Sequence, residues 1–143
     1  MTVEKCTEQI FHLIPLLDKK FQRPLSLHLK PWISPLQVHV LTVLAAKKAT
    51  MTELAAEIPM SKQQMTPIVD KLFAEGLVQR EYDEVDRRII RISITESGLE
   101  LRETVKEKAL KILADKLNYL SRRDVEHLNE TLTELHRIID KLP

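Results

Sequence analysis

The fold of this chain is decided by residues 50–98, which read TMTELAAEIPMSKQQMTPIVDKLFAEGLVQREYDEVDRRIIRISITESG. Thr50 is a good helix N-cap, and Glu53 stands three positions on, where its side chain can bond back to the backbone amide of the cap. Pro59 has no amide hydrogen and disfavours helical backbone at Ile58. A short helix is therefore predicted to begin at Thr50 and to end at Pro59.

A second helix is predicted to follow at once. Ser61 is its N-cap, and Gln64 at the third helical position completes a capping box. Gly76 supplies the left-handed residue that ends it. Its apolar side consists of Met65, Ile68, Val69 and Leu72. Its opposite side carries Lys62, Gln63, Thr66, Pro67, Asp70 and Lys71, which are groups able to meet bases and phosphates in a major groove.

Two strands, residues 77–82 and 89–94, and a charged loop between them predict a hairpin after this helix. In the loop, Asp86 stands two residues before Arg88 and can hold its guanidinium by a charge-assisted bond. A stiffly held arginine at a loop tip suits the negative minor groove of DNA. The order helix, turn, helix, hairpin is a winged helix-turn-helix. The fold class is therefore expected to be mainly α with a small β-hairpin wing (α+β).

Five segments of this region resemble the MarR family of bacterial transcriptional regulators: SKQQMT (61–66), VDKL (69–72), EGLV (75–78), DRR (86–88) and ITESG (94–98). The resemblance implies a homodimer that binds a pseudopalindromic DNA operator, usually as a repressor. It places helix 61–75 in the major groove and the wing tip in the minor groove. Two departures stand out: Ile94 where the family commonly has leucine, and the acidic Glu81, Asp83 and Glu84, which lower the positive charge of the wing.

Within this expectation each DNA-binding residue has a predicted role. Asp86 orients Arg88, and Arg87 and Arg88 contact the minor groove or its phosphates. Gln63 and Thr66 are the candidates for reading base edges. The candidates for phosphate contacts are Ser61, Lys62 and Lys71.

The segments on either side are predicted to be helical. Residues 1–33 and 97–143 are expected to form dimerisation helices around a winged helix-turn-helix DNA-binding domain at 34–96. Pro15 and Pro24 are expected to kink or end the first helix. Ser34 and Pro35 open another helix, whose predicted core residues are Leu36, Val40, Leu41 and Leu44. After a cap at Ser121, steps of three and four separate Val125, Leu128, Leu132, Leu135, Ile139 and Leu142, a stripe that favours packing against a second subunit.

The signal sensed is left open among three kinds. A small aromatic or phenolic effector is the one that the resemblance implies, and the residues expected to border its pocket are Phe11, His12, Trp32, His39 and Arg102. A redox signal through Cys6 is the second, because a helix N-terminus and Lys5 would both lower a thiol pKa. Metal sensing is the third, although the five histidines show no ligand spacing typical of zinc.

The composition of the chain limits which other classes of protein remain possible. The chain has 143 residues, 43% hydrophobic and 30% charged, which is the balance of a globular domain. The single cysteine excludes an intrachain disulfide, and the lack of a long apolar run or signal-type N-terminus predicts a cytoplasmic protein with no membrane partner. No motif of a cofactor site, a metal site or an enzyme is present. Because the net charge of +1 lacks a basic excess, a winged-helix module that binds other proteins stays open.

Overall fold

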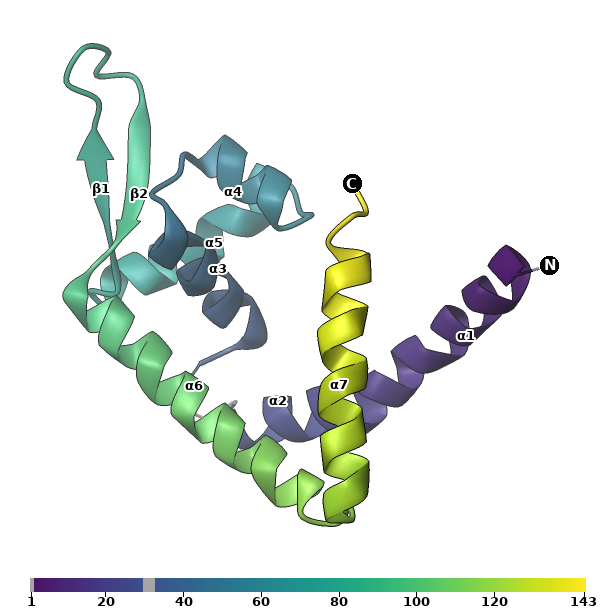
Figure 1. Ribbon diagram of the computed structural model, residues 1–143. Coiled ribbons are helices and arrows are strands. Elements are labelled where there is room, and N and C mark those ends of the chain that lie inside the picture. The colour runs from purple at the N-terminus through teal and green to yellow at the C-terminus, as the bar shows by residue number, and fades with distance from the viewer. Residues whose placement is uncertain (1, 30–32) are drawn as a thin grey trace. The chain divides into compact units, whose positions relative to one another are not determined.

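The structure is a computed structural model that describes residues 2–29 and 33–143. The chain divides into two compact units, within residues 1–109 and within residues 110–143. Figure 1 shows the helices and strands, which are α1 (Thr2–Leu17), η1 (Asp18–Gln22), α2 (Arg23–Leu29), α3 (Pro35–Ala46), α4 (Met51–Glu57), α5 (Lys62–Ala74), β1 (Val78–Tyr82), β2 (Ile90–Ile94), α6 (Glu96–Leu117) and α7 (Arg122–Ile139). The fold is mainly helical with a two-stranded antiparallel wing, which confirms the predicted class.

Side chains at the caps start the helices of the first unit where the sequence predicts. Ser34 accepts a bond from the amide of Gln37 at 3.2 Å, and its own amide donates to the Gln37 side chain at 2.9 Å. Thr50 likewise accepts from the amide of Glu53 at 3.2 Å. The expected bond from the Thr50 amide to Glu53 is replaced by one from the Thr50 hydroxyl, at 3.2 Å.

One hydrophobic core holds α3, α4, α5 and the wing together. Its fully buried side chains are Val40, Leu41, Leu54, Met65, Val69, Leu72, Val78 and Ile92. Leu36 was expected in this core, but its side chain is 43% exposed. The first turn of α3 instead buries Gln37, whose amide group is held by the cap that it forms with Ser34.

The wing is antiparallel, with Val78 opposite Ile94 and Tyr82 opposite Ile90. Ala49, just after α3, extends the sheet by exchanging two backbone bonds with Ile92, of 3.1 and 2.7 Å. These bonds fix the base of the wing to the connection between α3 and α4.

Thr95 joins the wing to α6. Its amide donates to the Leu77 carbonyl at 3.1 Å and its hydroxyl to the Gly76 carbonyl at 2.7 Å, while the same hydroxyl accepts from the amide of Gly98 at 3.1 Å. Gly76 has a φ of 73°, as predicted for a residue that ends a helix. The helix that was expected after Gly98 begins earlier, at Glu96, so Gly98 lies within its first turn.

The N-terminal segment departs from the expectation at Pro15. Helix α1 continues past this proline to Leu17. The chain then widens into the π-helical turn η1, where the amide of Arg23 bonds to the Asp18 carbonyl, before α2 begins. This wider turn lies just ahead of Pro24, whose ring would crowd the carbonyl four residues earlier in a regular α-helix.

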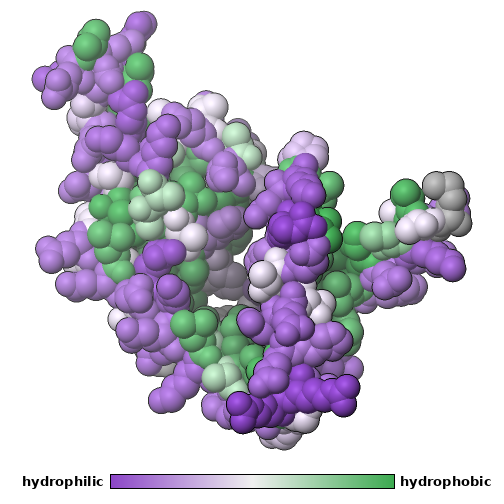
Figure 2. All heavy atoms as spheres, viewed as in Figure 1, coloured by the Kyte–Doolittle hydropathy of each residue, from purple (hydrophilic) through white to green (hydrophobic). Residues whose placement is uncertain are grey.

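The second unit contains α7, which Ser121 caps by accepting a bond from the amide of Asp124 at 3.1 Å. All residues of α7 are described by the structure, and none of them is buried. Figure 2 shows the hydrophilic side of α7, and it shows hydrophobic residues along α1. Within the described part of the chain, no helix combines the length and apolar character needed to cross a membrane.

Candidate nucleic-acid interface

Helix α5 begins with a closed capping box. Ser61 accepts a bond from the amide of Gln64 at 3.2 Å, and the Ser61 amide donates to the Gln64 side chain at 3.1 Å. Gln64 is thereby occupied at the cap. The predicted contact residues Lys62, Gln63, Thr66 and Lys71 are all exposed.

At the wing tip, Asp86 holds Arg88 as the spacing predicts. One carboxylate oxygen accepts from Nε of Arg88 at 3.1 Å and the other from Nη2 at 3.2 Å. The Asp86 carboxylate also accepts from the amide of Arg88 at 3.0 Å. The Arg88 side chain remains 91% exposed. The loop therefore presents a guanidinium whose direction is fixed and whose outer edge is open, next to an exposed Arg87.

A second aspartate, for which the sequence predicted no supporting role, orders the same loop. Asp83 accepts bonds from the amides of Asp86 at 2.9 Å and Val85 at 3.1 Å. It also accepts from Nη1 of Arg91 on β2 at 2.7 Å. The loop is thus tied to the strand that follows it.

These contacts keep both carboxylates ionised. The backbone bond from Asp86, followed by the side-chain bond from Arg91, lowers the pKa of Asp83. The side-chain bond from Arg88 lowers the pKa of Asp86. The anionic forms that hold the arginines are favoured at neutral pH.

Two acidic residues of the wing have cationic partners in the structure. Glu81 pairs with Lys48 at 3.0 Å, a contact that lowers the pKa of Glu81, and Asp83 pairs with Arg91. Their charges are balanced within the wing and its base.

Arg80 on β1 joins the wing to α5, a contact for which the sequence carried no signal. Its Nη2 lies 3.0 Å from a carboxylate oxygen of Asp70, and its guanidinium carbon lies 4.7 Å from the centre of the Phe73 ring. Asp70 and Phe73 are both on α5. Arg80 therefore links a strand of the wing to α5 through two side-chain contacts.

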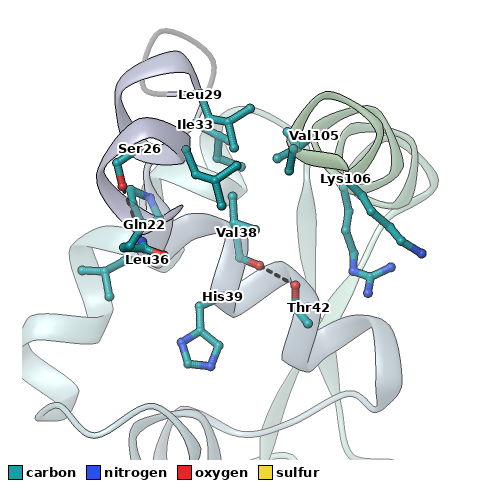
Figure 3. Close-up of a pocket in the computed structure, with 14 residues that line it drawn as sticks. Gln22, Ser26, Leu29, Ile33, Leu36, Val38, His39, Thr42, Val105 and Lys106 are labelled. Atoms are coloured by element: carbon teal, nitrogen blue, oxygen red, sulfur yellow. Dashed lines mark hydrogen bonds between the residues drawn. The ribbon is translucent and has the colours of Figure 1, made fainter. Parts of the chain in front are cut away.

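A cavity of about 480 Å³ lies within the first unit, between residues of η1, α2, α3 and α6. Figure 3 shows Gln22 and Ser26 on one side of it, His39 and Thr42 on α3, and Val105 and Lys106 on α6. Arg102 also lines it, and its buried Nε has no hydrogen-bond partner among the residues that the structure describes.

Two of the five predicted pocket residues, His39 and Arg102, therefore line this cavity. Phe11 and His12 lie on α1 and are not part of its lining; their rings meet edge to face, 5.6 Å apart. Trp32 lies outside the described residues. Cys6, the residue considered for redox sensing, is exposed near the start of α1.

The sequence profile of the MarR family matches residues 33–89. The HTH-type transcriptional regulator YhbI of Bacillus subtilis is 26% identical over 93% of this chain and 88% of its own length. The HTH-type transcriptional regulator SarZ of Staphylococcus haemolyticus is also 26% identical, over 53% of this chain, and the match spans about half of that regulator, 52%.

Solved structures share the fold. A variant of S. aureus MepR superposes with a TM-score of 0.77 at 20% identity, covering 90% of this chain and 96% of that chain. A variant of E. coli MarR complexed with operator DNA gives 0.65 at 23% identity, covering 89% and 93%. The profile covers α3, α4, α5 and the wing up to Ile89, and YhbI extends the likeness over nearly the whole chain; the chain is similar in sequence and fold to the MarR family of winged helix-turn-helix transcriptional regulators.

Proposed function

We propose that this protein is a homodimeric repressor that binds a specific double-stranded DNA operator, with α5 in the major groove and the wing in the minor groove. The observation that carries the proposal is the arginine at the wing tip. Arg88 is held by two bonds to Asp86 and is still 91% exposed, so the side chain is oriented for a partner outside the chain. Two relatives of the same fold, MarR and MepR, have been solved with operator DNA and with an oligodeoxyribonucleotide, which supports DNA as that partner.

The proposed roles at α5 follow from its caps. Ser61 and the first amides of α5 form a helix N-terminus, which favours a phosphate. Lys62 and Lys71 add positive charge for further phosphates. Gln63, unlike Gln64, is not occupied at the cap, so its amide is available to a base edge.

The test is fluorescence-anisotropy binding to the promoter DNA beside the protein's own gene, across a series of salt concentrations. We expect Arg88→Ala to weaken binding by about 10-fold or more, the usual range when one well-placed base contact is removed. If Arg88 also neutralises a phosphate, the slope of log affinity against log salt should become shallower by about one in the variant.

Arg122→Ala is the matched control. Arg122 is 93% exposed and pairs with Glu126 at 3.1 Å, but it lies at the start of α7, outside the proposed interface. Equal effects of the two substitutions would contradict the proposed role of the wing. If the folded wild-type dimer shows no salt-dependent binding to DNA, the result would favour a winged-helix module that binds other proteins. The near-neutral charge left that alternative open.

We further propose that a small aromatic acid or phenol enters the cavity and releases the repressor from DNA. The unpaired Nε of Arg102, with Lys106 and His39 in the same lining, suits a ligand with an anionic group. Benzoate and phenol, titrated into the operator complex, test this. Arg102→Gln should raise the benzoate concentration needed for release. If wild type and Arg102→Gln were released at the same benzoate concentration, the result would contradict the proposal that the effector binds in the cavity.

Oxidation of Cys6 is a second candidate signal, because its side chain is exposed to solvent. Release of the operator by an organic hydroperoxide, lost in Cys6→Ser and unchanged in Arg102→Gln, would favour Cys6 over the cavity as the sensor.

A further inference from the structure

Thr66, on the exposed side of α5, has a hydroxyl hydrogen that is already used. Its Oγ1 donates to the carbonyl of Lys62, one turn earlier, at 2.7 Å. A hydroxyl has one hydrogen, so this side chain cannot also donate to a base while the bond lasts. The bond holds the oxygen against the helix backbone and leaves the methyl group as the part of the side chain that is not tied to it.

Pro67 is the next residue and is also exposed. Its ring carries only C–H groups, and its nitrogen has no hydrogen to donate. Both residues lie away from the buried side of α5, which is formed by Met65, Val69 and Leu72. The methyl group of Thr66 and the ring of Pro67 are therefore exposed apolar groups in a part of α5 whose other exposed side chains, those of Lys62, Gln63 and Asp70, are polar.

Only one apolar group is displayed by bases in the major groove, the 5-methyl group of thymine. We infer that Thr66 and Pro67 select a thymine at one position in each half of the operator, by packing against that methyl group. The inference rests on the proposed DNA-binding function and adds to it a base preference and the residues that set it. The polar side chains of Lys62 and Gln63 are left for the neighbouring phosphates and bases.

A rival reading uses the oxygen of Thr66. Its lone pairs can still accept a bond from the amine of adenine or cytosine. The two readings make opposite demands on the side chain, because serine keeps the oxygen and loses the methyl group, whereas valine keeps a methyl group and loses the oxygen.

The experiment measures anisotropy on operators in which each thymine in turn is replaced by uracil. This change removes the 5-methyl group and leaves every hydrogen-bonding group in place. For the wild type we expect one position in each half-site where uracil weakens binding about fourfold, the factor that corresponds to burial of one methyl group. Replacing both half-sites should weaken binding about 16-fold, the square of that factor.

The variants assign the effect to Thr66. In Thr66→Ser, binding to the thymine operator should be weaker by a similar factor, and the uracil effect at that position should disappear. In Thr66→Val, the uracil effect should persist. Thr133→Ser on α7 is the matched control, because the Thr133 hydroxyl also donates to a carbonyl one turn earlier, Asn129 at 2.9 Å, outside α5.

Three results would overturn the inference. A uracil effect of the same size in wild type and Thr66→Ser would assign the thymine contact to another residue. A loss of affinity in Thr66→Val but not in Thr66→Ser would assign the oxygen to a base amine. In both cases operator binding would remain, so the proposed function would stand. Absence of wild-type binding to any operator would remove both proposals together.

Discussion

The two glycines of this chain are required for different physical reasons. Gly76 has a left-handed φ of 73°, and a Cβ atom added there would meet no other atom within 4 Å. Gly98 has no such backbone demand. A Cβ atom there would lie 2.2 Å from the Leu77 carbonyl oxygen and 2.7 Å from Cγ1 of Ile94. The start of α6 therefore packs directly on the backbone at the foot of the wing.

We expect Gly98→Ala to be the more damaging of the two substitutions. Gly76→Ala should cost about 1–2 kcal/mol of unfolding free energy, the strain of a left-handed alanine. Gly98→Ala should cost about 3 kcal/mol or more, because backbone atoms must move to admit the methyl group. Urea unfolding followed by circular dichroism measures both. A larger loss of unfolding free energy in Gly76→Ala than in Gly98→Ala would mean that α6 moves easily away from the wing to admit the methyl group.

At the scale of elements, Arg80 connects the wing to α5 in addition to the core that they share. Its pair with Asp70 is exposed on both sides, so it should add less than about 1 kcal/mol to stability. Its value lies in orientation, since it contacts Asp70 and Phe73 on α5 from a strand of the wing. A change in the angle between the wing and α5 would misplace one of the two proposed DNA contacts whenever the other is made.

We expect Arg80→Ala to weaken operator binding about threefold to tenfold while leaving the unfolding free energy within about 1 kcal/mol of wild type. Asp70→Asn separates orientation from charge. It breaks the ion pair but keeps the Arg80 cation, so a loss of affinity in both variants supports positioning. If Asp70→Asn binds as tightly as wild type while Arg80→Ala is weak, Arg80 acts on DNA directly.

The elements that could be predicted from the sequence are those set by local chemistry. The caps at Ser34, Ser61 and Ser121 depend on bonds to residues three positions on, and the structure has all three. The Asp86–Arg88 pair is equally local. Leu36 was placed wrongly because helical spacing identifies an apolar side but not how far the core extends along it.

The remaining contacts join residues distant in sequence. Gly98 beside Leu77, Arg80 beside Asp70, and Asp83 beside Arg91 all follow from how the hairpin packs and pairs. Spacing within one element carries no signal for them. The cavity likewise unites η1, α2, α3 and α6, which explains why His39 and Arg102 were found in its lining while Phe11 and His12 were not.

For the whole molecule, the exposed apolar side chains of the terminal helices favour a dimer. The 3–4 stripe of α7 leaves Leu132, Leu135 and Ile139 about 40% exposed, at 43%, 39% and 43%. On α1, Phe11 is 74% and Ile14 62% exposed. We propose that residues 1–33 and 97–143 cover these side chains in a homodimer and so set the spacing of two domains formed by residues 34–96, about one duplex turn apart.

Charge introduced into the stripe should separate the subunits. We expect Leu132→Glu combined with Leu135→Glu to give a monomer in sedimentation equilibrium, because a dimer would have to bury both carboxylates in an apolar interface. Affinity for the full operator should fall by about 100-fold or more, since two linked half-sites bind far more tightly than one. Binding to a DNA duplex that carries a single half-site should change little, because α5 and the wing are untouched. Thr133→Glu, on α7 but outside the stripe, should stay dimeric. A double variant that remains a dimer with full affinity would place the interface elsewhere and leave the α7 stripe without this role.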